Sequence, residues 1–310
     1  MQKGHACQQR SCRAKLSPGL ADTKRMNPNP DQPSSAPGQF PPVLTDILSG
    51  TGFSGRLWTT QELNALAEQA PLPNHPDLWP LLAFTQIKRI ASRPDFPCYF
   101  AAKAFDSGGQ RFLFCDTPDS PATLDNLATN LSEYLRIVER TSGWEALATI
   151  MFVVFKPLNP IASLEEYHNQ GWRILDYLHR HDPQPWPADI PTDIEDPGWT
   201  FCYNGVSLFV NMSCPAHVNR KSRNVGDSFA FILQPRAGFD EVAGNNPKGN
   251  QVRRMIRARI GRYDTIGPSP ALGSYGDGAT LEWKQYALQD DNEPTKAQCP
   301  LKKLFPRRSK

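Results

Sequence analysis

Apolar residues recur at helical spacing in several parts of the chain. After Ser120-Pro121 they stand three or four positions apart, which puts them on one face of a helix: Leu124, Leu127, Leu131, Leu135 and Val138. We expect this helix to close at Gly143, since glycine commonly follows a helix C-terminus. A Thr or Ser three residues before a Glu predicts helix starts at Thr59 and Ser163. The same spacing predicts further helices over residues 78–90 and 250–262.

Short apolar runs bounded by turn residues predict strands. Residues 96–105 and 110–115 flank Ser107-Gly108-Gly109, which indicates a hairpin. Asn204-Gly205 lies between two apolar runs within residues 199–212, and this dipeptide is the strongest short-range signal for a two-residue type I′ hairpin turn. Two further strands are expected over residues 149–155 and 229–234.

The order of these elements predicts an α+β fold with a largely antiparallel sheet and flanking helices, because hairpins occur early and late without regular strand–helix alternation. A doubly wound α/β fold is the alternative. We expect a single main domain over residues 45–295, because no linker-like stretch divides it. Residues 1–44 are polar and proline-rich and are expected to form a disordered arm, and residues 296–310 are expected to form a basic tail.

Composition narrows the classes of function. The seven cysteines lack the Cys-x-x-Cys spacing of a metal site and are expected to be reduced thiols of a cytoplasmic protein. The sequence contains no apolar run of about 18 residues, so we expect no membrane-spanning helix. The net charge is only +3, yet residues 215–262 hold ten Lys and Arg against three acids. That concentration of positive charge suits an anionic ligand.

The loop over residues 213–224, which follows the Asn-Gly hairpin, carries the candidate chemistry. It holds Cys214, His217, Arg220 and Arg223 within ten residues of one another, beside a hydrophobic sheet. A thiol or an imidazole can bind a transition metal, and guanidinium groups can bind an anion. The combination suits a bound anionic cofactor. Two plainer interpretations stay open, namely a surface imidazole at His217 and a solvated arginine face.

Several segments, taken in order, resemble the YqcI/YcgG family over roughly residues 80–290. They are Phe96-Pro97-Cys98, the apolar run 152–155 before Lys156-Pro157, Gly171-Trp172, Pro-Ala-His-x-x-Arg-x-Ser-Arg-Asn-x-Gly from Pro215, the strand ending before Arg236, and Arg-x-x-Ile-Arg-x-Arg from Arg253. Much of the family has a His immediately before the Pro of the loop, where this chain has Cys214. This departure leaves the identity of an axial ligand open.

The resemblance implies haem-dependent hydroxylation of a guanidine nitrogen, because the family includes such enzymes. The cofactor implied is haem b. His217 is the preferred iron ligand and Cys214 the alternative, while Arg220, Arg223 and Arg236 are expected to bind the propionates. Arg236 can instead bind a substrate carboxylate or pair with a nearby acid. The expected partners are a small guanidine- or amino-acid-like substrate and dioxygen or peroxide.

A guanidinium substrate calls for a carboxylate beside aromatic side chains, because bidentate pairing and cation–π contact recognise that planar cation. Glu282 and Trp283 are the candidates for this catalytic-site role. A solvated acid beside a core tryptophan is the plainer interpretation of the same pair.

Two other classes of function stay open. A non-catalytic haem- or small-ligand-binding protein would use the same cofactor residues without a substrate carboxylate. A phosphate- or nucleic-acid-binding module would place the arginines of residues 250–262 on an open surface. The sequence holds no recognised nucleic-acid-reading motif, so we do not expect a nucleic-acid partner, nor a membrane partner. A homodimer is left open.

Overall fold

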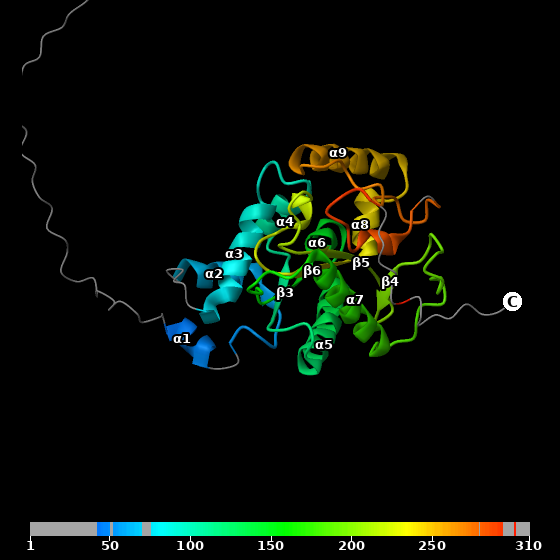
Figure 1. Cartoon of the computed structure of the whole chain (residues 1–310). Coiled ribbons are helices and arrows are strands. Elements are labelled where there is room, and N and C mark those ends of the chain that lie inside the picture. Colours follow the sequence, from blue (N-terminus) through cyan, green and yellow to red (C-terminus); the bar gives the residue numbers. More distant parts are fainter. Residues whose placement is uncertain (1–41, 50–51, 70–75, 279, 294–300, 302–310) are drawn as a thin grey trace, which may run out of the picture. The chain divides into compact units, whose positions relative to one another are not determined.

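One mixed β-sheet forms the centre of the fold (Figure 1). The computed structural model describes residues 42–49, 52–69, 76–278, 280–293 and 301, which fall within one compact unit spanning Phe40–Lys310. Six strands of the described part lie in the order β1-β2-β3-β6-β5-β4. They are β1 (Trp58–Thr59), β2 (Arg111–Cys115), β3 (Met151–Phe155), β4 (Phe201–Tyr203), β5 (Val206–Ser213) and β6 (Ala230–Pro235).

The strand pairing corrects the expected fold class. Within the α+β arrangement, β2 and β3 are parallel while the other described pairs are antiparallel, so the sheet is mixed rather than largely antiparallel. The hairpin expected over residues 96–105 and 110–115 is wrong, because α4 (Ala101–Ser107) occupies half of it. Gly108, with φ of 72°, closes that helix instead of forming a hairpin turn. After β2, the chain forms helices over Pro121–Val138 and Gly143–Ala148 before it enters β3. Parallel strands require such a crossover connection.

The second predicted hairpin is confirmed. β4 and β5 pair antiparallel, with Phe201 opposite Leu208. The two turn residues both have positive φ, 50° at Asn204 and 74° at Gly205, as a type I′ turn requires. The turn thereby fixes which side chains of β5 face each side of the sheet.

All of the predicted helices form, and both predicted capping boxes are present. The backbone N–H of Thr59 donates to Glu62 at 2.8 Å, and that of Ser163 donates to Glu166 at 2.7 Å. The helix beginning at Pro121 ends at Val138, and Gly143 starts the next helix instead of closing this one. The remaining helices are α1 (Pro42–Ser49), α2 (Thr60–Gln69), α3 (Trp79–Ala91), α5 (Pro121–Val138), α6 (Gly143–Ala148), α7 (Leu164–Arg180), α8 (Arg236–Ala243) and α9 (Pro247–Tyr263), with short 3₁₀ turns at Pro76–Leu78, Lys221–Arg223 and Glu282–Gln285.

Helices cover both faces of the sheet, and each face has its own hydrophobic core. α5 and α7 lie side by side on one face and pack against Val153 of β3. α2, α3 and α4 cover the other face, where Phe152 and Val154 point. This alternation along β3 follows from the strand's two-residue period. No helix in the described ranges combines the length and the apolar character needed to cross a membrane.

The ends of the chain fall largely outside the described residues. The residues outside the description include 1–41 of the predicted arm. They also include all of the predicted tail, residues 296–310, except Leu301. α1 begins at Pro42, three residues before the predicted start of the main domain. Leu301 is described and is fully buried in the core on the α5 and α7 face.

Candidate functional site

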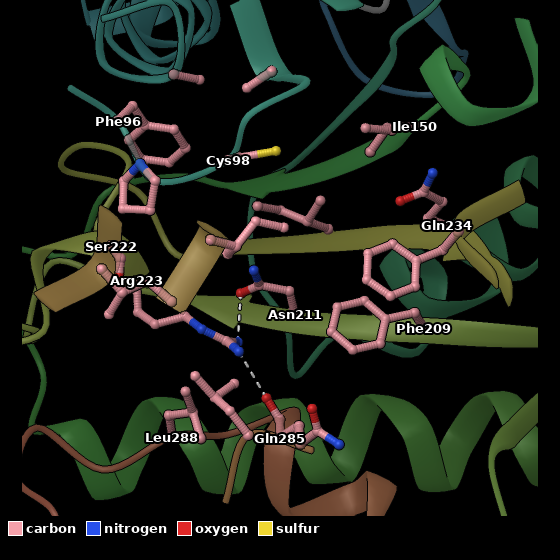
Figure 2. Close-up of a pocket in the computed structure, with 18 of the residues that line it drawn as sticks. Phe96, Cys98, Ile150, Phe209, Asn211, Ser222, Arg223, Gln234, Gln285 and Leu288 are labelled. Carbon is pink, nitrogen blue, oxygen red and sulfur yellow. Dashed lines mark hydrogen bonds between the residues drawn. The ribbon is translucent and has the colours of Figure 1, made fainter. Parts of the chain in front are cut away.

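A cavity of about 270 Å³ lies on the sheet face opposite α5 and α7 (Figure 2). β5 and β6 line it with Phe209, Asn211, Ile232 and Gln234, while their alternate residues enter the other core. The remaining walls come from the segment that precedes and forms α4, from α8 and α9, and from the chain after α9. Most lining side chains are apolar. The volume is just below the range of about 300–1,000 Å³ that is usual for small-molecule sites.

The loop after β5 delivers a buried arginine to this cavity. Arg223 Nη1 donates to Asn211 Oδ1 at 2.8 Å, and Nη2 donates to the carbonyl oxygen of Gln285 at 2.9 Å (Figure 2). Burial lowers the pKa of Arg223 to about 9. These contacts are to neutral acceptors, so the charge of Arg223 has no carboxylate within ion-pair distance in the described part of the chain.

Arg220 lines the same cavity and keeps one donor free. Its residue is 1% exposed; Nε donates to the carbonyl oxygen of Gln289 at 2.6 Å, and Nη2 to that of Asp291 at 2.7 Å. Nη1 is buried and has no hydrogen-bond partner among the described residues. An unpartnered buried donor costs free energy, so an anion at this position would gain a charge-assisted hydrogen bond.

Two carboxylates hold the loop in this conformation. Asp290 accepts hydrogen bonds from the backbone N–H groups of Asn219, at 3.0 Å, and Arg220, at 2.7 Å. Asp264 accepts from the backbone N–H and the hydroxyl of Ser222, at 2.7 and 2.8 Å. These bonds fix the backbone from which Arg220 and Arg223 extend.

Arg236 forms a second charged group in the cavity wall. It is the first residue of α8, directly after β6. Its Nη1 lies 2.5 Å from Glu282 Oε1, and its Nη2 lies 2.8 Å from Asp240 Oδ1. Burial raises the pKa of Glu282 to about 7, although Arg236 acts to lower it. Tyr275 stacks on this group, with its ring centre 3.9 Å from Arg236 Cζ.

The two predicted iron ligands lie beside the cavity rather than in its wall. His217 is 1% exposed, and its Nε2 is 2.8 Å from the carbonyl oxygen of Leu288. Since a carbonyl only accepts, Nε2 carries the proton, and Nδ1 accepts from the Cys214 thiol at 3.3 Å. Burial lowers the pKa of His217. Ligation of iron by this ring would replace one of these two bonds, and the assignment of His217 or Cys214 stays a prediction.

Glu282 and Trp283 face different parts of the molecule. Glu282 is 3% exposed and lines the cavity. Trp283 is also buried, but its indole packs against Trp172 in the core on the α5 and α7 face, at a ring distance of 6.2 Å. Of this predicted pair, only the carboxylate is therefore placed to meet a ligand in the cavity.

Three arginines of α9 contact the rest of the protein, namely Arg253, Arg257 and Arg259. Arg253 and Arg257 line the cavity, one helical turn apart. Arg259 Nη2 donates to the carbonyl oxygen of Pro94 at 2.7 Å, and its Nε to that of Phe96 at 3.2 Å. α9 thus closes one side of the cavity and is tied to the segment that carries Cys98.

Sequence reasoning did not single out Cys98 or Arg253 as site residues, although both line the cavity. Cys98 is a free thiol on an exposed residue, and desolvation of its sulfur raises the pKa. Figure 2 shows it across the cavity from Gln285 and Leu288. The signal that could have found Cys98 was the Phe96-Pro97-Cys98 segment itself, which was interpreted as the start of a strand.

The family model described as the YqcI/YcgG family matches residues 86–302. The chain belongs to the YqcI/YcgG family. This confirms the resemblance found in the sequence, and the matched range contains every residue described above as lining the cavity.

Curated members of the family align over most of this YqcI/YcgG chain. It is 37% identical over 247 residues to the Streptomyces lavendulae protein named "Putative N(omega)-hydroxy-L-arginine synthase DcsA", covering 77% of this chain and 92% of that protein. Two Bacillus subtilis (strain 168) proteins named as uncharacterized, YqcI and YcgG, are 35% and 34% identical, covering 73% and 80% of this chain and 89% and 97% of those proteins. No solved structure matches the chain significantly.

Proposed function

We propose that this protein hydroxylates a guanidino nitrogen of L-arginine or of a closely related guanidine, with haem as its cofactor. The observation that carries the proposal is the 37% identity to the protein named as an N(omega)-hydroxy-L-arginine synthase, over 92% of that protein. The residue types of the cavity wall support it, because apolar side chains suit a porphyrin, buried arginines suit its propionates, and a buried carboxylate suits a cationic group.

The residues of the cavity fit haem in three respects. Its phenylalanine and isoleucine side chains suit an apolar macrocycle. Arg220, with its unpartnered Nη1, and the neighbouring Arg223 would hold the propionates. Cys98 offers a thiol from the opposite wall. When bound, haem supplies the oxidation of the substrate nitrogen, and the protein supplies the ligand, the charge of the walls and the orientation of the substrate.

Cys98 is the iron ligand that the cavity favours. It is a free thiol in the wall, whereas His217 lies outside it with both ring nitrogens already in hydrogen bonds. The raised pKa of the thiol is no obstacle, because a bound metal ion displaces the proton from its ligand. His217 and Cys214 are the competing candidates, and the experiment below separates the three.

The overall reaction fixes what must be supplied. With dioxygen, one oxygen atom enters the N–OH group and the other leaves as water, so a separate donor must provide two electrons and two protons. With hydrogen peroxide, the N–H group becomes N–OH and one molecule of water is released without a donor. The carboxylate of Glu282, ionised when a cation lies beside it, is placed to bind a cationic group of the substrate.

Absorption spectroscopy tests the cofactor and its ligand. We expect protein purified from haem-supplied cells to show a Soret band at about 400 nm. Cys98→Ser should change the band of the reduced carbon monoxide complex from the thiolate type, whereas Cys202→Ser, at a buried cysteine outside the cavity, should not. A change seen only in His217→Ala transfers the assignment to the imidazole, and one seen only in Cys214→Ser transfers it to that sulfur. Protein that never takes up haem would refute the cofactor.

Turnover tests the reaction itself. Incubation with L-arginine and either hydrogen peroxide or a reductant with dioxygen should yield a product heavier by one oxygen atom, detected by mass spectrometry. Hydroxylation on the guanidino group is then assigned from fragmentation. A protein that holds haem but leaves every guanidine unchanged under both conditions would instead be a non-catalytic haem-binding protein.

A further inference from the structure

Arg253, a buried arginine of the cavity wall, has no carboxylate within ion-pair distance among the described residues, and the same holds for Arg223. Arg253 of α9 is 7% exposed, and it donates from Nη1 to the carbonyl oxygen of Ala243. Its Nε is buried and has no hydrogen-bond partner, and no described carboxylate lies within ion-pair distance of it. Arg236, equally buried nearby, has two such carboxylates. Arg253 is thus a buried cation with no carboxylate in contact, although Asp240 and Asp277 act to raise its pKa from beyond ion-pair distance.

A buried charge without a counterion is costly, and an anion that enters the cavity would relieve that cost. Burial disfavours the charged form of Arg253, which an incoming anion would restore. The guanidinium can offer Nε and a neighbouring N–H in the fork geometry that suits a carboxylate. The structure therefore offers a carboxylate site at Arg253 that is ready before the ligand arrives.

The surroundings of Arg253 indicate which anion it takes. The guanidinium lies 5.9 Å from the ring centre of Phe239, which stacks on Phe209 of β5. The side chain of Arg223 binds Asn211, two residues farther along β5 than Phe209. The carbonyl oxygen of Arg223 accepts a hydrogen bond from the hydroxyl of Ser213. Arg253 is therefore linked through Phe239 to Phe209 of β5, whereas Arg223 contacts β5 directly, two residues farther along the strand. The two groups suit two separate anions, one from the cofactor and one from the substrate.

An acidic group accompanies Arg253 in the cavity wall. Glu282 lines the same cavity as Arg253, and the charge of Arg253 acts to lower the pKa of Glu282, which favours the ionised carboxylate. A propionate gains nothing from a nearby carboxylate. The head group of an α-amino acid carries a carboxylate and an ammonium group on one carbon, and it can meet Arg253 and Glu282 together.

We propose that Arg253 binds the α-carboxylate of an amino-acid substrate, with Glu282 beside the α-ammonium group. The inference rests on the proposed function only for the identity of the side chain, the guanidino group. In this binding mode, Arg253 selects amino acids over amines. The far end of the substrate then lies away from Glu282, in the remainder of the cavity.

The test compares ligands that differ only in the carboxylate. Isothermal titration calorimetry on the haem-loaded protein would measure the affinities of L-arginine and of agmatine, which lacks the carboxylate. We expect wild type to prefer arginine by at least about tenfold, the value of one charge-assisted hydrogen bond. Arg253→Gln should abolish the preference and leave agmatine binding within about twofold, whereas Arg253→Lys should keep part of it. Arg254→Gln, an exposed arginine on the same helix, should behave as wild type.

Three outcomes overturn the inference. The first is that the preference for arginine survives in Arg253→Gln. The second is that Arg253→Gln loses haem while the preference stays, which would make the anion a propionate. The third is that no carboxylate-bearing ligand binds wild type better than its amine counterpart. For the last arm, L-lysine, L-homoarginine and L-glutamine are each paired with the corresponding amine. If arginine fails to bind but another amino acid binds in an Arg253-dependent manner, the proposed arginine substrate is wrong and the carboxylate site stands. Circular dichroism of each variant confirms that it is folded.

Discussion

Arg236 and Glu282 are 2.5 Å apart in the cavity wall, although 46 residues separate them in the sequence. Both side chains are at least 95% buried. Burial alone would favour a neutral Glu282, and Arg236 is the group that most strongly favours its charge. The arginine also binds Asp240 on its own helix, so it compensates two carboxylates at once. Arg236 thereby links the start of α8 to the chain after α9.

We expect Arg236→Met to lower the free energy of unfolding by about 3 kcal/mol at pH 8, because it leaves a buried carboxylate without its partner. Arg173→Met is the matched control. Arg173 pairs with Asp119 at 2.9 Å, but both side chains are 58% exposed, and its loss should cost less than about 1 kcal/mol. Urea denaturation of both variants measures the difference. Equal losses would show that the buried pair contributes no more than a surface pair.

Acid sensitivity is expected from His168 of α7. Its residue is 3% exposed, its Nε2 has no partner in the described part of the chain, and burial lowers its pKa to about 3. Folding therefore keeps the ring neutral, while the unfolded chain takes up a proton below its ordinary pKa of about 6.5. The contribution of the neutral His168 ring to the free energy of unfolding is fully present above pH 6.5. It is lost as the pH falls from about 6.5 toward 3, at about 1.4 kcal/mol per pH unit.

Substitution isolates this contribution. Between pH 6.5 and pH 5, wild type should lose about 2 kcal/mol more stability than His168→Leu, as measured by denaturant unfolding across the pH range. His181→Asn, at an exposed histidine just after the same helix, should follow the wild-type curve. If His168→Leu loses stability as steeply as wild type over this interval, the ring is already charged in the folded protein.

The sequence predicted elements best where local chemistry decides them. The capping boxes at Thr59 and Ser163 and the Asn204-Gly205 turn involve residues at most three positions apart, and all three form as expected. The hairpin expected over residues 96–115 failed because Gly108 suits both a hairpin turn and a helix C-cap. Tertiary packing selected the cap, and the parallel pairing of β2 with β3, 40 residues away, leaves no local signal.

The site was predicted unevenly for the same reason. Arg220, Arg223, Arg236 and Glu282 were singled out for their charge, and the fold brings them to one cavity. Trp283 turns away from it because adjacent residues of a 3₁₀ turn point in different directions. Arg253 looked like one of several arginines on a basic helix. Only the packing of α9 on α8 separates it from the exposed Arg254.

The two serines that precede long helices should differ in their contribution to stability. Ser163 accepts from the backbone N–H of Glu166 at 3.2 Å, whereas Ser120 occupies the same position before α5 with no side-chain hydrogen bond. Ser163→Ala should therefore lower the free energy of unfolding by about 1 kcal/mol, and Ser120→Ala by much less. Thermal or urea unfolding measures both. Equal effects would mean that the hydroxyl of Ser163 contributes nothing beyond its conformational preference.

Two helical glycines should respond to alanine in opposite directions. A Cβ at Gly171 of α7 would lie 2.5 Å from Met212 Sδ and 3.1 Å from Phe231 Cε2, both in the core. The overlap should cost about 1–3 kcal/mol, more than the roughly 1 kcal/mol that alanine gains over glycine in a helix. At Gly261 of α9 the nearest atom is Pro268 Cδ at 3.7 Å, so only the gain applies. Urea unfolding should show Gly171→Ala less stable and Gly261→Ala more stable than wild type. A stabilised Gly171→Ala would contradict the close packing of α7 on the sheet, because it would require Met212 to move aside without cost.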